Sequence, residues 1–117
     1  MLYFYEDKGE GWAYNVGVEL DPDKILISEW NLSQTAKDCY GDSDAEFFLI
    51  IKRKNAERFL RACCNEEGLS KEKIDENPTD EIILDVLKKL YMGKKSAFMN
   101  MKKVLQRNDI SYEFQHW

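Results

Sequence analysis

Residues 45–52 (AEFFLIIK) constrain the fold most, because this segment is apolar at both odd and even positions. Successive side chains of a strand point to opposite faces of the sheet. The odd positions from 47 to 51 hold Phe, Leu and Ile, and the even positions 48 and 50 hold Phe and Ile. A strand with two apolar faces is typically central and covered. We expect the odd-numbered face to pack on helices. The other face would be covered by residues 31–43 or would meet a partner.

Three more segments of the first half predict strands. Residues 2–5 are a short aromatic run, and residues 12–20 alternate between apolar and small or polar side chains, the period of a half-buried strand. Residues 8–11 (KGEG) between them predict a hairpin turn, because Gly tolerates a positive φ. Pro22, in an Asp-Pro-Asp turn, precedes a third strand at residues 24–30. Residues 31–43 are polar and predict a loop.

The second half predicts three helices and a final strand. Asn55 is placed to cap a helix over residues 56–67, and Gly68 to end it. Thr79 would cap a second helix that ends at Gly93, and Ser96 a third. The apolar positions of each helix recur at helical spacing. Ile110, Tyr112, Phe114 and His116 then alternate with polar residues, which predicts a last strand over 110–116.

Strands come before helices in this order, β-β-β-β-α-α-α-β. That order indicates an α+β protein with a mostly antiparallel sheet of about five strands and three helices packed on one face. At 117 residues the chain fits one domain, residues 1–117.

Charge is unevenly divided along the chain. Residues 1–50 carry eleven acidic and three basic side chains, and residues 51–117 carry eleven acidic and fourteen basic ones. The net charge of −5 argues against a nucleic-acid partner, which is itself a polyanion. Five basic residues in and beside the predicted third helix are better explained as a solvated face; they are Lys94, Lys95, Lys102, Lys103 and Arg107.

The sequence offers no signal for secretion or for a membrane. The N-terminal segment lacks a basic start and a long apolar stretch, and no apolar run reaches the length of about 20 residues that a membrane helix needs. Cys39, Cys63 and Cys64 form no CxxC pair, and the last two fit a buried helix face. We expect a cytoplasmic protein with reduced thiols, no membrane contact and no metal or other cofactor.

Two groups of residues contain side chains that could form a chemical site. Asp42, Asp44 and Glu46 alternate as oxygen ligands of a calcium loop do, but Phe47 stands where that loop requires Gly. His116, the only histidine, could serve as a base beside Glu113, although a histidine at a strand end is more often structural. We therefore predict no catalytic and no metal-binding residue.

Two segments resemble small bacterial immunity proteins encoded beside polymorphic and contact-dependent growth-inhibition toxins. They are GDSDAEFFLIIK at residues 41–52 and ISYEFQHW at residues 110–117. The resemblance implies a short, acidic, cytoplasmic α+β protein without enzymatic activity that binds the toxic domain of its cognate effector. Because many such toxins are nucleases with basic clefts, an acidic surface would compete with the phosphate backbone for the cleft.

The candidate toxin-binding residues are acids with aromatic side chains nearby in the sequence. They are Asp38, Asp42, Asp44 and Glu46, with Trp30, Tyr40 and Trp117 as aromatic anchors. Two alternatives stay open: a small enzyme or ligand-binding domain with a pocket between sheet and helices, and a structural adaptor or homodimer that pairs through an exposed sheet edge. The oligomeric state and the kind of toxin stay open too.

Overall fold

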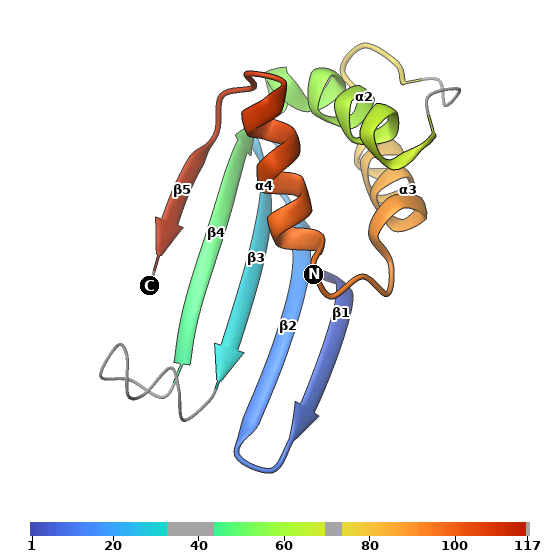
Figure 1. Cartoon of the computed structure of the whole chain (residues 1–117). Coiled ribbons are helices and arrows are strands. Elements are labelled where there is room, and N and C mark those ends of the chain that lie inside the picture. Colours follow the sequence, from blue (N-terminus) through green and yellow to red (C-terminus); the bar gives the residue numbers. More distant parts are fainter. Residues whose placement is uncertain (33–43, 70–73, 117) are drawn as a thin grey trace.

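A computed structural model describes residues 1–32, 44–69 and 74–116. Its elements are β1 (Leu2–Gly9), β2 (Trp12–Leu20), β3 (Lys24–Leu32), β4 (Asp44–Lys52), the 3₁₀ turn η1 (Arg53–Asn55), α2 (Ala56–Glu67), α3 (Asp80–Tyr91), α4 (Ala97–Arg107) and β5 (Glu113–His116). The strands form one antiparallel sheet in the order β1-β2-β3-β4-β5, and the helices lie on one face of it (Figure 1). The predicted α+β class and element order are confirmed.

The register of the strands fixes which side chains face the helices. Ile27 of β3 lies between Val18 of β2 and Leu49 of β4, and all three are almost fully buried. The odd-numbered side chains of β4 therefore point to the helices, as the sequence predicts. The even-numbered ones, Phe48 and Ile50, are half-buried on the other face of the sheet, which we call the helix-free face.

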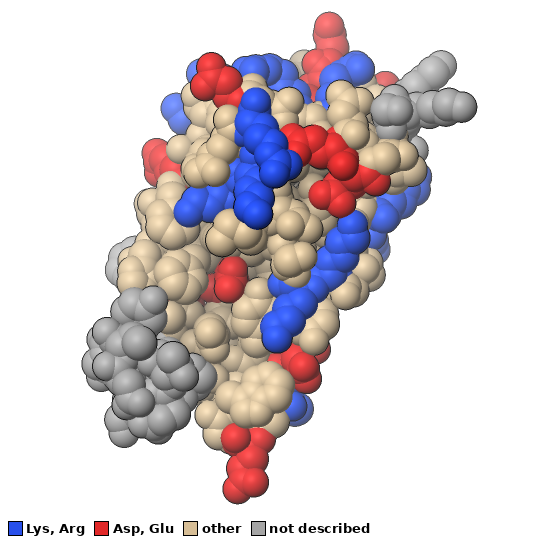
Figure 2. Space-filling view, in the orientation of Figure 1, with Lys and Arg blue, Asp and Glu red and all other residues tan. Residues whose placement is uncertain are grey.

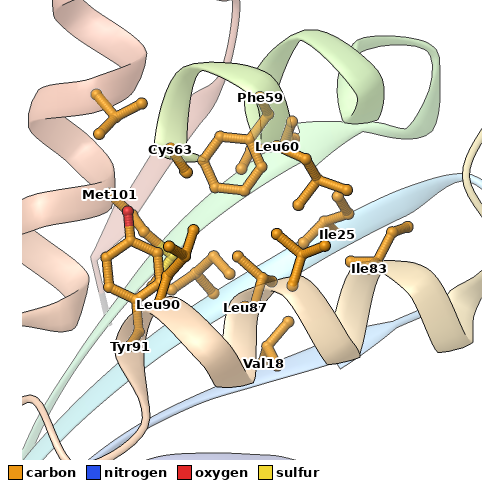
Figure 3. Packing of buried hydrophobic residues seen from close by; sticks show 14 of the residues in the cluster. Val18, Ile25, Phe59, Leu60, Cys63, Ile83, Leu87, Leu90, Tyr91 and Met101 are labelled. Atoms are coloured by element: carbon orange, nitrogen blue, oxygen red, sulfur yellow. The ribbon is translucent and has the colours of Figure 1, made fainter. Parts of the chain in front are cut away.

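The core is built by this sheet face and the apolar sides of the three helices (Figure 3). Phe59, Leu60 and Cys63 of α2 are fully buried, and so is Tyr91 at the end of α3. The hydroxyl of Tyr91 points toward Cys63 and has no hydrogen-bond partner of good geometry among the described side chains. Burial raises the pKa of the Cys63 thiol to about 12, so the thiol stays protonated and unreactive.

Backbone and side-chain contacts join the sheet to the helices. The Gly93 amide donates to the Phe4 carbonyl at 2.7 Å, where a register shift bulges β1. Arg53 donates to the Asp21 carbonyl at 2.9 Å and forms an ion pair of 2.7 Å with Asp80 at the start of α3. The turn between β2 and β3 is thereby connected to α3.

Helix capping matches the sequence in part. Thr79 accepts from the Ile82 amide at 3.3 Å, and Gly68 ends α2 at a φ of 88°. Asn55 and Ser96 occupy the predicted N-cap positions of α2 and α4, but neither side chain makes a capping hydrogen bond. At α2 the capping bond is absent because the 3₁₀ turn η1 leads directly into the helix. Ala56, which follows η1, already has the backbone angles of an α-helix.

Several element boundaries differ from prediction. β1 extends to Gly9 and β3 to Leu32, because each continues its ladder with β2. β5 covers only Glu113–His116, while Ile110 and Tyr112 pack against the core ahead of the strand. Within the described ranges, no helix is long and apolar enough to span a membrane.

Candidate functional site

The helices cover only part of the sheet face that they pack on. A strand of nine residues, such as β3, is about 30 Å long, whereas a helix of twelve, such as α3, is about 18 Å long. In β3 the inward positions change accordingly, since Ile25 and Ile27 are fully buried but Glu29 and Asn31 are half-exposed. Figure 1 shows the uncovered part near the turn between β1 and β2.

We call this uncovered area the open end of the sheet. The register of the strands assigns these residues to it: Tyr5, Asp7, Trp12, Tyr14, Glu29, Asn31, Phe47, Phe114 and His116. Figure 2 shows lysine and arginine side chains gathered over the helices, and a mostly uncharged sheet surface below them, with acidic atoms near its centre. An aromatic surface with few charges is typical of the centre of a protein interface.

Aromatic rings pack against one another on both sides of the open end. Tyr5 and Tyr14 meet edge to face, with ring centroids 6.0 Å apart. On β4 and β5, Phe47 stacks on His116 at 4.7 Å and an interplanar angle of 7°, and on Phe114 at 6.1 Å. Such contacts hold each ring in one position, so little conformational entropy would be lost on binding a partner.

Trp12 extends the aromatic surface to the tip of the β1–β2 hairpin. It is 40% exposed, and its indole ring occupies the space where a side chain at Gly9 would stand. Only Gly leaves room for the ring to lie flat on the opposite strand. The hairpin thus presents a large apolar side chain to solvent in a fixed position.

Tyr14 connects the hairpin to the segment between α3 and α4. Its hydroxyl donates to the Lys95 carbonyl at 2.9 Å, and the Lys95 ammonium lies 5.7 Å from the centroid of its ring. Burial, followed by the nearby Glu29 carboxylate, raises the pKa of Tyr14 far above neutrality, so the phenol remains a hydrogen-bond donor.

Glu29 is the half-buried carboxyl at the centre of the open end. It pairs with Val16 on β2 and with Phe47 on β4, and its carboxyl lies near the Tyr14 hydroxyl. Burial raises its pKa, and the neighbouring Tyr14 hydroxyl opposes part of that effect. Among the side chains that the structure describes, no Lys or Arg forms an ion pair with it.

The basic residues around α4 are largely occupied by partners within the chain. Lys94 forms an ion pair with Glu67 at 2.8 Å, and Arg107 with Glu66 at 2.7 Å. The Lys102 ammonium lies 4.1 Å from the centroid of the Phe114 ring. A nucleic-acid surface needs basic groups that are available to phosphates. The contacts of Lys94, Lys102 and Arg107 within the chain reduce the positive potential that these side chains could present to a phosphate.

The predicted toxin-binding residues are only partly described. Trp30 and Glu46 are directly opposite each other on β3 and β4, half-buried on the helix-free face. With Tyr3 and Phe48 they line a shallow hollow of about 230 Å³. Asp44 begins β4, opposite Leu32. Asp38, Tyr40, Asp42 and Trp117 lie outside the described residues.

Residues that could support catalysis are not brought together in the described part of the chain. His116 shares the face of Phe47, whereas Glu113 pairs with Ile50 on the helix-free face. A hollow of about 660 Å³ is lined by Glu113 together with Lys24 and Lys52, but His116 does not line it, and it is open to solvent. No group of three potential metal ligands occurs among the residues searched.

Sequence reasoning missed Glu29, Tyr14 and Phe47 as site residues. The sequence contains a signal for Glu29. It is the next alternate residue after Ile25 and Ile27, so it lies on the same face of the strand and interrupts their apolar pattern. A polar residue at an inward position indicates where the covering layer ends.

Comparison of the chain with protein-family models, with curated proteins and with solved structures finds no match.

Proposed function

We propose that this chain is a cytoplasmic immunity protein that binds and neutralises a bacterial toxin domain through the open end of its sheet. The observation that carries the proposal is the aromatic surface left uncovered by the short helices, with Glu29 at its centre. The hollows found among the described residues are shallow and open, which suits a protein partner better than a small molecule.

Acidic residues surround the open end. The described ones are Glu6, Asp7, Glu10, Glu29 and Asp44, with Glu46 on the helix-free face of the same strand end. The basic residues there are Lys8, Lys95 beside the Tyr14 ring and Lys102 beside the Phe114 ring. The sequence that joins β3 to β4, residues 33–43, contains Asp38 and Asp42 and one basic residue, Lys37. A basic partner would be attracted to this end, and such steering raises association rates toward roughly 10⁸–10⁹ M⁻¹s⁻¹ at low salt.

Co-expression with the toxin encoded by the neighbouring gene tests the proposal. We expect the purified proteins to form a stable complex and the chain to protect cells from the toxin. A toxin that kills equally well in the presence of the chain, and that does not bind it, would refute the proposal.

A charge-reversal pair tests the location of the interface. Asp42→Lys with Asp44→Lys should slow association and leave the stability unchanged, because charges at an interface rim act chiefly on the association rate. Asp75→Lys with Glu81→Lys makes the same change in net charge at exposed positions near the helices and should have a much smaller effect. Equal effects of both pairs would place the interface elsewhere.

A further inference from the structure

We propose that the open end contains a receptor for an arginine side chain of the partner, formed by the Glu29 carboxylate between the rings of Phe47 and Tyr14. This inference rests on the proposed function and specifies the chemistry that its partner presents. The receptor uses three described residues on adjacent strands β2, β3 and β4.

The orientation of the Phe47 ring is the first argument. Phe47 and His116 are parallel and 4.7 Å apart, which is about the spacing of neighbouring strands. The two rings therefore stand upright on the sheet with their faces along the strand-to-strand direction. One face of Phe47 is covered by His116 on β5, and the opposite face lies on the side of β3, where Glu29 is the residue paired with Phe47.

The second argument is the state of the Glu29 carboxylate. It is half-buried between strands whose neighbouring side chains are apolar or aromatic, and no described cation pairs with it. Removing a carboxylate from water without a counter-charge costs free energy, and folding alone would favour a neutral side chain here. A cation from a partner would supply the missing charge.

The third argument is that rings in this area already bind cations. The Lys95 ammonium lies near the face of Tyr14, and that of Lys102 lies 4.1 Å from the ring centroid of Phe114. Arginine suits a carboxylate beside aromatic rings better than lysine does, because a planar guanidinium can contact a ring while it donates two parallel hydrogen bonds to a carboxylate. Phe47 offers the face and Glu29 the two oxygens.

An NMR titration tests the receptor without a toxin. The probe is N-acetyl-arginine methylamide, added at millimolar concentrations to the isotopically labelled chain, and the neutral analogue N-acetyl-citrulline methylamide has nearly the same shape. We expect the arginine probe to shift the amide signals of Glu29, Phe47 and Tyr14. The citrulline probe should leave them unchanged.

Two variants separate the receptor from general charge effects. Glu29→Gln should weaken arginine binding by roughly fivefold, the range of a partly exposed ion pair. Glu113→Gln removes one negative charge from the helix-free face and should leave binding unchanged. Equal shifts with the two probes, or equal binding by wild type and Glu29→Gln, would overturn the inference.

The same variants distinguish this inference from the proposed function. If the chain binds the arginine probe at Glu29 but fails to bind or neutralise the toxin, the receptor stands and the immunity function is wrong. If the toxin is neutralised and Glu29→Gln changes neither the probe shifts nor the dissociation rate of the complex, the function stands and the receptor is wrong.

Discussion

The buried hydroxyl of Tyr91 leads to a prediction with an unusual sign. Tyr91 is fully buried, and its hydroxyl faces the Cys63 thiol, a weak hydrogen-bonding group, without a geometric hydrogen-bond partner among the described side chains. Leaving a polar group buried without a partner costs about 1–3 kcal/mol. We take the lower end because the thiol offsets part of the cost. Tyr91→Phe is therefore expected to raise the free energy of unfolding by about 1 kcal/mol.

The expected rise in midpoint temperature follows from the size of the chain. Unfolding entropy is about 2.1 cal/mol/K per residue, which for 117 residues gives about 0.25 kcal/mol/K. A gain of 1 kcal/mol then raises the midpoint by about 4 °C. Urea titration followed by circular dichroism measures the free energy, and a thermal scan measures the midpoint.

Tyr14→Phe is the matched control, because it deletes the same atom from a tyrosine that does have a partner. Its hydroxyl donates to the Lys95 carbonyl at 2.9 Å, so the substitution should lower the free energy of unfolding by about 1 kcal/mol. The two variants are expected to move in opposite directions. A loss of 1 kcal/mol or more in Tyr91→Phe would show that the buried hydroxyl makes a strong bond, and the reasoning would be refuted.

Three further predictions concern the sheet and the thiols. A Cβ at Gly17 would stand 2.7 Å from a backbone oxygen of β1, so Gly17→Ala should cost about 1–3 kcal/mol in urea titration, whereas Asn15→Ala on the same face should cost less. Burial raises the pKa of Glu29 in the folded chain, so this carboxyl stabilises the fold most at low pH and loses that contribution as pH rises through the folded pKa. Stability curves of Glu29→Gln and wild type should therefore diverge in favour of the variant as the pH rises above the ordinary glutamate pKa of about 4.3, and parallel curves would contradict the assignment. In a Cys39→Ser background, thiol reagents should react slowly with native protein and fast with unfolded protein, because Cys63 is buried and its pKa is raised to about 12; a fast native reaction would contradict its burial.

Most of the fold could be predicted because local pattern and packing agree. The two apolar faces of residues 45–52 correctly indicated a strand with neighbours on both sides, and its odd positions do face the helices. Capping was harder to predict. Thr79 caps α3 with its side chain, whereas Asn55 occupies the N-cap position of α2 without a side-chain bond, because a 3₁₀ turn already leads into that helix.

The site could not be predicted as a whole, because it depends on the mismatch between strand and helix lengths. Alternation along β3 indicates that Glu29 faces inward, but it does not say how far the covering helices reach. From the sequence, Phe47 is expected to be a core residue. In the structure it is only partly buried, because the helices do not cover the sheet at its position. The sequence pointed instead to the acids of residues 38–46, of which Glu46 lies on the helix-free face.

The position of β5 has a consequence for the dynamics of the molecule. It pairs through four residues with a β4 strand of nine, and the chain between the two strands runs through all three helices. Closing so long a connection for so few hydrogen bonds makes this pairing a natural point of local unfolding. Hydrogen exchange should be fastest in this strand pair. Each opening of this strand pair would separate His116 from Phe47. A ligand that binds Phe47 and stabilises this stacked arrangement would therefore slow hydrogen exchange in β5, one strand away from its own contacts.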